Sequence, residues 1–296
     1  MKKINIIITS ALLIVSSALF AQKESVSAFY RTNMNVVNPA YAGFDDLSLV
    51  TTTLRKQWTG IAEAPETQTV SVSAPLGGNL GIGVSVINDR TFIEKQTYLG
   101  LDLSYKLRLG ETADLYLGIK AGGNFYNVNT SGLQTYGVES DPALFSISSL
   151  SPNIGVGAVY KNGPMYVSLS VPTMLKTKKA KNDMGYATAV SQDPRFYLSG
   201  GYDIRLSDYP TELVLKPSVM LRYVDGTPLS ADFTAMLEIN QKFNIGLMYR
   251  TDKAYGSLAS ISLGKHFLFG YAYEMSTMSE LARARNTNEI LLQYKF

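Results

Sequence analysis

The sequence contains no cysteine and a single histidine, His266, and these shortages exclude several kinds of site. Without cysteine the chain can form no disulfide framework, no thiolate metal centre and no lipid-modified N-terminal cysteine. One histidine leaves almost no material for a Ser-His-acid triad or a histidine metal cluster. We therefore expect a protein that is not an enzyme, with no catalytic residues, no metal and no cofactor.

Long apolar runs are also missing, except at the start of the chain. Lys2 and Lys3 precede an almost unbroken apolar run from Ile4 to Phe20, and Ala21 supplies a small residue before Gln22. This order predicts a secretory signal peptide over residues 1–21, cleaved before Gln22; an uncleaved membrane anchor is the alternative. Further along, no stretch approaches about 18 consecutive apolar residues, so we expect no transmembrane helix.

A strong charge of either sign is the third feature that the sequence lacks. The formal net charge is +3, and removal of Lys2 and Lys3 from the 27 basic residues leaves 25 against 24 acidic residues. A nucleic-acid-binding protein usually carries a basic excess, so the balance gives no support to a nucleic-acid partner.

Tyrosine and glycine, by contrast, are abundant, with 19 and 24 residues. From about residue 48 onward, apolar and polar residues alternate in segments that fit strands. The pattern is clearest over residues 99–109, where every odd position is leucine or tyrosine while Asp102, Ser104, Lys106 and Arg108 share the other face. We predict fourteen strands: 48–58, 67–75, 80–88, 97–109, 113–123, 152–161, 164–171, 195–206, 211–223, 229–239, 242–250, 256–264, 266–274 and 287–296.

Two features favour a transmembrane barrel over a soluble sandwich. In the last predicted strand Ile290, Leu292, Tyr294 and Phe296 share one face, with Leu291 as the only breach, and the strand ends on an aromatic residue. The even-numbered connections are all short, whereas two of about 28 and 23 residues follow the fifth and seventh strands. Short periplasmic turns, long external loops and an even strand count are typical of bacterial outer-membrane barrels.

The predicted architecture is therefore all-β, an antiparallel up-and-down barrel of about 14 strands in the bacterial outer membrane. Residues 48–296 would form the barrel and residues 22–47 a periplasmic N-terminal segment or a plug. Carboxylates are predicted to face the lumen at Asp102, Asp203, Asp232 and Glu238. Matching cations are Lys106, Arg108, Lys120, Arg205, Lys216, Arg222 and Arg250, which indicates a satisfied polar lumen rather than a catalytic carboxylate pair.

The segment before the barrel carries the most specific motifs. Tyr30-Arg31-Thr32-Asn33 is followed by Asn38-Pro39-Ala40-Tyr41-Ala42-Gly43, then by Arg55-Lys56-Gln57-Trp58 and by Leu80-Gly81-Ile82-Gly83 leading into Asn88-Asp89. In these elements and their spacing the chain resembles the PorP/SprF family of outer-membrane proteins. It departs from that pattern at Arg90-Thr91-Phe92-Ile93, where a glycine would be expected, so the resemblance implies nothing for the external loops.

The resemblance implies a role in the type IX secretion system, in secretion or surface attachment of large proteins such as gliding adhesins. The implied partners are an exported cargo protein with a C-terminal sorting domain and the periplasmic ring of the system. We predict that Tyr30, Asn38, Pro39, Tyr41, Gly43 and Trp58 contact such a partner, from the periplasm or from the barrel mouth. On the residues alone, 38–43 could simply be a turn that leads into the first strand.

One external loop has a cluster of positive charge. Lys176, Lys178, Lys179 and Lys181 could bind lipopolysaccharide phosphates or an acidic partner surface, or could belong to a solvated mobile loop. Two other functions remain open from the sequence. A charged lumen would suit a diffusion porin, and a barrel without a transport function would be a passive outer-membrane scaffold.

Overall fold

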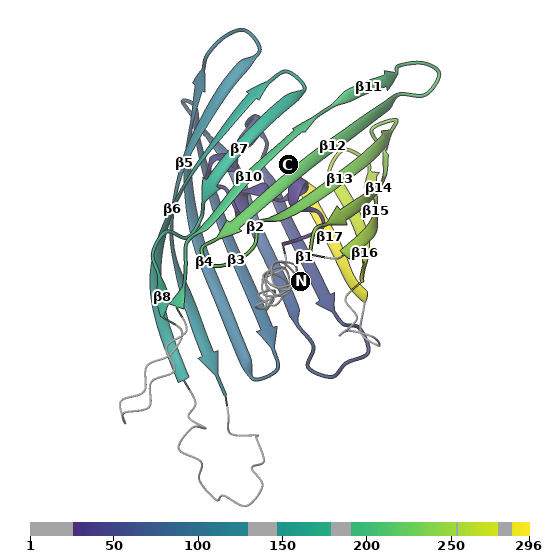
Figure 1. The fold of residues 1–296 in the computed structure, drawn as a ribbon. Helices are drawn as coiled ribbons and strands as arrows, with labels where there is room; N and C mark the ends of the chain where they lie inside the picture. The colour runs from purple at the N-terminus through teal and green to yellow at the C-terminus, as the bar shows by residue number, and fades with distance from the viewer. Residues whose placement is uncertain (1–25, 130–146, 179–190, 253, 278–285) are drawn as a thin grey trace, which may run out of the picture.

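The chain folds into a closed antiparallel β-barrel in the computed structural model, which describes residues 26–129, 147–178, 191–252, 254–277 and 286–296 (Figure 1). The barrel strands are β1 (Leu49–Gln57), β2 (Glu66–Gly77), β3 (Leu80–Thr91), β4 (Glu94–Arg108), β5 (Ala113–Val128), β6 (Ile147–Asn162), β7 (Met165–Val171), β10 (Arg195–Tyr202), β11 (Ile204–Ser207), β12 (Leu213–Val224), β13 (Ser230–Ile239), β14 (Phe243–Arg250), β15 (Ala254–Leu263), β16 (Phe267–Ser276) and β17 (Asn286–Lys295). Because β10 and β11 are one strand interrupted at Asp203, the wall has fourteen strands, as predicted.

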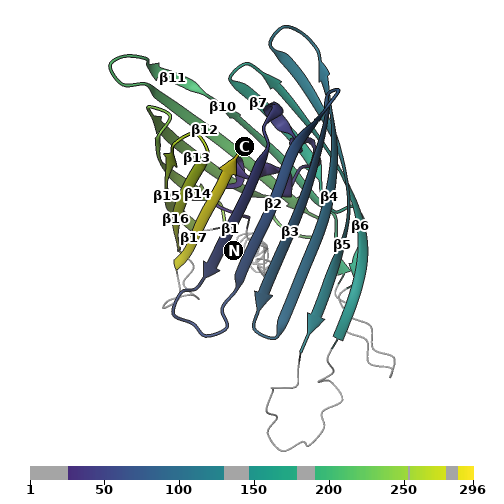
Figure 2. The same ribbon diagram turned by 180° about the vertical axis from the view of Figure 1, so that it is seen from behind.

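Every strand pairs with its neighbour along the chain, and the first and last strands close the circle. β1 pairs with β17 from Leu49 opposite Lys295 to Gln57 opposite Thr287, and both β10 and β11 pair with β12. Figure 2 shows this seam between β1 and β17 from behind. The pairing of β1 with β17 and of β10 with β12 closes the described wall into a barrel, the form in which strands can span a membrane. None of the helices in the described part of the chain is long and apolar enough to cross a membrane.

The hairpins on one side of the barrel are longer than the alternation predicted. β4 begins at Glu94, β5 continues to Val128, and β6 begins at Ile147 opposite Val128. Backbone pairing continues here through mostly polar residues, among which Phe125 and Leu150 are isolated apolar residues on the outer face, so the alternation is too weak to mark the strand ends. The connection after β7 also contains a short ribbon of β8 (Thr177–Lys178) and β9 (Ser191–Gln192). The predicted loop residues 130–146 and 179–190 lie outside the described parts.

The outer face is apolar, as the alternation predicted. Leu101, Leu117 and Phe269 are exposed on it, and Leu215 is half-buried among neighbouring strands. At the end of the barrel that carries the short turns, the ring of Tyr294 lies 4.9 Å from that of Phe267 and 4.8 Å from that of Phe296. Aromatic rings at strand ends suit the headgroup level of a membrane.

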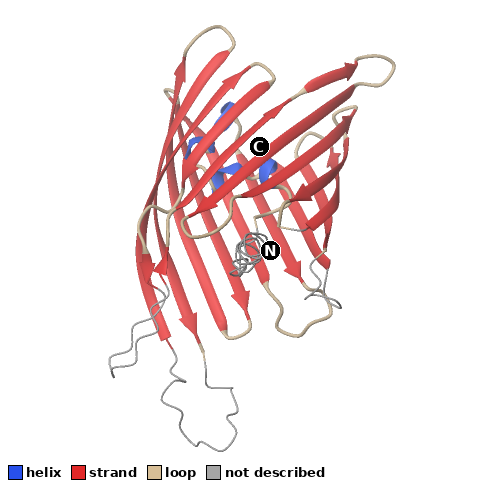
Figure 3. Cartoon of the chain, in the orientation of Figure 1, coloured by secondary structure: helices blue, strands red, loops and turns tan. Residues whose placement is uncertain are grey.

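Residues 26–47, here called the inner segment, lie inside the barrel (Figures 1 and 3). They form four single 3-10 turns: η1 (Tyr30–Thr32), η2 (Met34–Val36), η3 (Pro39–Tyr41) and η4 (Phe44–Asp46). The segment begins beside Arg250, near the end of the barrel that carries the long loops, and reaches β1 at the short-turn end. It therefore crosses much of the lumen before the first strand starts.

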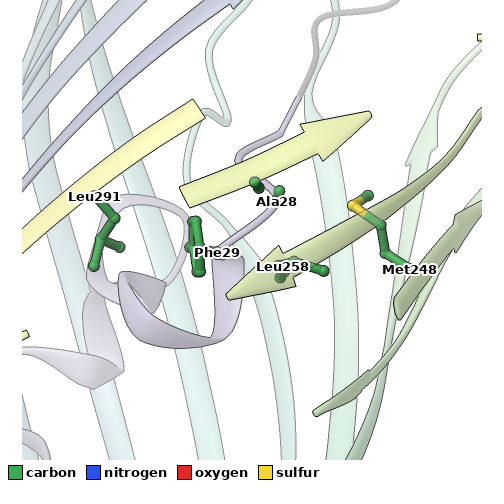
Figure 4. Close-up of a cluster of buried hydrophobic side chains, with 6 residues drawn as sticks. Ala28, Phe29, Met248, Leu258 and Leu291 are labelled. Atoms are coloured by element: carbon green, nitrogen blue, oxygen red, sulfur yellow. The ribbon is translucent and has the colours of Figure 1, made fainter. Parts of the chain in front are cut away.

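The apolar core of the molecule lies between the inner segment and the wall. One cluster packs Ala28 and Phe29 against Leu291, Leu258 and Met248 (Figure 4). A second joins Tyr30 and Met34 to Tyr197 and Met220, and a third joins Ala40 to Tyr116 and Val159. Leu291, the one apolar residue on the predicted polar face of the last strand, is thus buried by Phe29 and its neighbours.

Candidate functional site: the segment inside the barrel

The motif Asn38–Gly43 forms the tightest bend of the inner segment. The side chain of Asn38 caps η3, because its Oδ1 accepts a hydrogen bond of 2.9 Å from the Ala40 N–H. Pro39 occupies the first position of the turn, where a missing N–H costs nothing. Gly43 then takes a left-handed φ of +65°, which glycine adopts without strain. The predicted turn is therefore correct, and it places the segment against the wall.

Glycines in the wall make room for this bend. A Cβ on Gly157 of β6 would lie 1.9 Å from Asn38 Oδ1, and one on Gly118 of β5 would lie 2.3 Å from the Ala40 nitrogen. A Cβ on Gly81 of β3 would lie 2.0 Å from the Ala42 oxygen. Real Cβ atoms essentially never approach so closely. The inner segment therefore packs directly on the backbone of these three glycines, and any side chain there would displace it. We call this contact surface of Gly81, Gly118 and Gly157 the seat.

Polar wall residues bind the same stretch. The amide of Asn38 donates to Ser168 Oγ at 2.8 Å and to the Ala158 carbonyl at 3.2 Å, and Ser170 Oγ donates to the Val37 carbonyl at 2.8 Å. Asn38 is fully buried. Buried amides are costly unless satisfied, so these bonds specify one position for the segment.

Near the long-loop end, a network of buried charges holds the first residues of the inner segment. Glu289 accepts a hydrogen bond of 2.9 Å from the Ala28 N–H and a short one from the Ser27 hydroxyl. Arg55 donates to Glu289 at 3.0 Å and to Glu274 at 2.9 Å. The network continues through Arg250, Asp232 and Arg222, and Arg250 donates to the Val26 carbonyl at 3.1 Å.

A second buried pair lies halfway along the lumen. Lys120 Nζ is 2.9 Å from Asp102 Oδ1, and both side chains are fully buried. The same ammonium group also donates to the Asn35 carbonyl at 3.2 Å. Because the two residues are cross-strand partners on β5 and β4, the wall presents this cation to the backbone of the inner segment.

Three ion pairs secure the inner segment at the short-turn end. Asp45 accepts from Lys161 at 2.6 Å, and Asp46 accepts from Lys106 at 2.9 Å. Arg31 pairs with Asp203, at the interruption between β10 and β11. These pairs are partly exposed, so each contributes little to stability.

The inner segment separates two cavities. One, of about 140 Å³, opens toward the long loops and has Val26, Val36 and Val37 of the segment in its lining, facing Tyr98 and Asn124 of the wall. The other, of about 250 Å³, opens toward the short turns. Its lining combines Tyr41, Phe44 and Leu47 of the segment with Tyr166 of β7 and the Arg31–Asp203 and Lys161–Asp45 pairs.

Two tyrosines of the inner segment are held in the neutral form. Burial raises the pKa of the Tyr30 hydroxyl, which donates to Ser218 Oγ at 2.9 Å. Burial also raises the pKa of the Tyr41 hydroxyl, which lies in the short-turn cavity. Neither phenol adds a negative charge to the lumen at neutral pH.

The structure brings five of the six predicted contact residues together inside the barrel. Tyr30, Asn38, Pro39 and Gly43 are buried against the wall, and Tyr41 is half-buried in the short-turn cavity. Trp58 is separate, in the connection from β1 to β2 at the long-loop end.

The lysine cluster is described only in part. Lys176 is exposed and pairs with Asp193 at 2.8 Å, and Lys178 lies in β8. Lys179 and Lys181 lie outside the described residues, as does the predicted signal peptide.

The predicted lumen charges are largely confirmed, with two corrections. Arg108 and Arg205 were expected to balance lumen carboxylates, but both are exposed near strand ends, and Arg205 pairs with Asp208 at 3.2 Å. Alternation assigns a face but not a depth, so it could not separate strand ends from the interior. The sequence reading also missed Ser27, Arg55, Glu274 and Glu289 as a group. Among the described residues, no group of three potential metal ligands comes together.

A closed barrel with an apolar outer face, aromatic strand ends and a segment filling its lumen defines an outer-membrane β-barrel protein with an inner plug-like segment. The model of the family described as "Type IX secretion system membrane protein PorP/SprF" matches residues 18–294, nearly the whole chain. The chain belongs to this family, and it is an outer-membrane component of the type IX secretion system. The family is described as one of secretion-system membrane proteins, and it is not a known enzyme family.

Solved barrels resemble the fold at very low sequence identity. The CymD monoaromatic hydrocarbon channel has a TM-score of 0.46 at 10% identity, over 93% of this chain and 94% of that one. A FadL homologue from Pseudomonas aeruginosa has a TM-score of 0.44 at 10% identity, over 87% and 91%. CdiB from Acinetobacter baumannii has a TM-score of 0.46 at 6% identity, over 84% and 60%. No curated protein matches the chain.

Proposed function

We propose that this secretion component is a closed docking barrel, which receives a partner at its short-turn, periplasmic end. The observation that carries the proposal is the inner segment itself, which lies across the lumen and is fixed to the wall along its whole described length. A barrel whose lumen is filled in this way is suited to binding rather than to free diffusion.

The short-turn cavity supplies the docking site. It offers aromatic surface from Tyr41 and Phe44, whose rings lie 4.7 Å apart, beside the partly exposed pairs Arg31–Asp203 and Lys161–Asp45. An apolar centre with charged groups at its rim is the usual composition of a protein-binding site. Because the segment is already ordered, a partner that docks here loses little entropy in ordering it.

The partner would be the periplasmic ring of the secretion system or the C-terminal sorting domain of an exported cargo protein. Both are met on the periplasmic side, where the short turns of outer-membrane barrels lie. Docking would place the cargo beside the barrel during secretion or attachment of a surface protein such as an adhesin.

Two variants test this proposal with matched chemistry. Leu49→Trp places an indole ring in the short-turn cavity, and Thr67→Trp places the same ring in the long-loop cavity. After recovery from detergent-solubilised outer membranes, Leu49→Trp should co-purify at least tenfold less ring or cargo protein than wild type, whereas Thr67→Trp should retain both. Heat-modifiable migration on gels verifies that each variant is folded. Equal retention by both folded variants would contradict the proposed docking end.

A diffusion porin is the second candidate, favoured by the two cavities and the charged lumen. A diffusion porin requires the inner segment to leave its seat and open the lumen. Conductance measurements would detect this opening. A passive scaffold, the third, would bind neither ring nor cargo in the same co-purification.

A further inference from the structure

The lipid-facing apolar rows of this barrel differ in length from strand to strand. On β4, β5, β6 and β12 the outward positions are apolar or tyrosine over 11 residues, at 99–109, 115–125, 150–160 and 213–223. On β2, β3 and β17 the rows cover only 7 residues, at 70–76, 80–86 and 290–296. On β1, between them, the row is Val50, Thr52 and Leu54.

The rows of β17, β1, β2 and β3 are contiguous, because these strands are neighbours around the seam, whereas a further 7-residue row on β14, at 243–249, lies apart from them. We call the outer surface of these four strands the seam face. Figure 2 shows β3 to β6 reaching further than β17 and β1. At the long-loop edge, the next outward residues of the seam face are polar: Asn288, Lys56, Gln68 and Asn88. Lys56 is exposed there and pairs with Glu66.

The register between β3 and β4 shows where the height changes at the short-turn edge. Leu80 is the first residue of β3 and lies opposite Tyr105 of β4. β4 continues beyond this pair, and Leu107 and Leu109 are both exposed on its outer face. The apolar surface of β4 therefore runs past the turn between β2 and β3 by about the length of four residues.

These lengths correspond to different membrane thicknesses. With a rise of about 3.3 Å per residue and a tilt of about 40°, a row of 11 residues spans roughly 25 Å of height and a row of 7 residues roughly 15 Å. The longer rows match the usual apolar band of outer-membrane barrels, which is about 25 Å tall. The seam face is shorter by roughly 10 Å, and a bilayer responds to a short hydrophobic span by thinning.

We infer that the seam face locally thins the outer membrane, so that the bilayer around this barrel is thick beside β4–β6 and thin beside β17 and β1–β3. Lipid is the occupant that fits, because the seam-face rows contain no charged residue while their long-loop edge carries polar groups and an exposed lysine at headgroup level. The thinned sector surrounds the seam where the first and last strands meet.

Spin labels at the ends of one row on each face test the inference. The chain has no cysteine, so Val70→Cys and Leu76→Cys on β2, and Leu115→Cys and Phe125→Cys on β5, each give one labelling site. Depth is measured for each label in dioleoyl-phosphatidylcholine vesicles, from its relative accessibility to oxygen and to a water-soluble nickel complex.

Thinning predicts that all four labels lie at the edge of the hydrocarbon, at similar shallow depths. A flat bilayer as thick as the β5 row would place at least one β2 label several ångströms deeper, and a flat thin bilayer would leave a β5 label in water. Either result overturns the inference. In dilauroyl vesicles, which are thin everywhere, the β2 labels should stay at the edge while a β5 label moves into water.

Discussion

Asn38 of the inner segment packs directly against the backbone of Gly157 of β6. A β-carbon on residue 157 would lie only 1.9 Å from Asn38 Oδ1, so no other residue type fits there. The same oxygen accepts from the Ala40 N–H, and the amide nitrogen of Asn38 donates to two wall strands. One side chain thus shapes the bend of the segment and attaches it to the wall. Neither role is possible unless the wall is bare at this point.

The seat can be tested by adding one methyl group. Gly157→Ala should displace Asn38 and cost about 1–3 kcal/mol, as overpacking of a well-packed core does. The barrel should still insert, but the inner segment should become sensitive to protease in detergent. Gly123→Ala on β5 is the control, because its Cβ would lie 3.3 Å from the flexible end of Leu150 and 3.8 Å from the Ser151 oxygen, which is an ordinary van der Waals contact. Equal protease resistance of both variants would show that the seat is not specific.

The buried pair of Lys120 and Asp102 predicts non-additive effects. Lys120→Met should destabilise the protein by about 3–5 kcal/mol, because it leaves the Asp102 carboxylate buried without a partner. The double variant Lys120→Met, Asp102→Leu should recover most of this loss, since neither charge remains. Urea unfolding in detergent micelles measures both. If the double variant loses as much stability as Lys120→Met and Asp102→Leu do when their separate losses are added, the two side chains do not interact.

The two faces of the wall should respond differently to charge. Ile119→Arg, on the outer face near the middle of the β5 apolar row, should cost roughly 2–4 kcal/mol. Thr67→Arg, which borders the long-loop cavity, should cost less because the guanidinium can reach water. Unfolding free energies in lipid vesicles make the comparison, and equal costs would contradict the assignment of faces.

The lysine cluster of the loop after β7 should act through long-range charge. Replacing Lys176, Lys178, Lys179 and Lys181 with glutamine should weaken binding to lipopolysaccharide vesicles, and wild-type binding should fall as salt rises. The pair between Lys176 and Asp193 already neutralises one of these charges, so the change should be modest. Unchanged binding, with cargo retention intact, would identify the cluster as an ordinary solvated surface.

Much of the barrel could be predicted from the sequence because the residues of each strand alternate between apolar, lipid-facing positions and polar, lumen-facing positions. Alternation identifies the two faces, and connection lengths identify the two ends, so strand number and order follow. Strand ends were harder to predict, as in β5 and β6, where pairing continues past the predicted ends and the only outward apolar residues are Phe125 and Leu150.

The inner segment was only partly predictable. Its turn residues signalled the bend at Asn38–Gly43, but its location depends on contacts between residues far apart in the chain, such as Ser27 with Glu289. Two local features of the sequence are consistent with a segment packed inside the barrel, although neither identifies which segment. Leu291 interrupts the polar face of the last strand, and glycines 81, 118 and 157 leave that same lumen face without side chains. Each is an irregularity of the wall where the inner segment makes contact.

Single-channel conductance tests the central claim, that the inner segment holds the lumen closed. The full chain, shown by heat-modifiable migration to be folded and then reconstituted in a planar bilayer, should give no steady open state. Phe29→Ala, which removes about 3–5 kcal/mol of packing against Leu291 and its neighbours, should give resolved openings. A stable ohmic conductance from the wild-type protein would contradict the account and make the diffusion porin the better description.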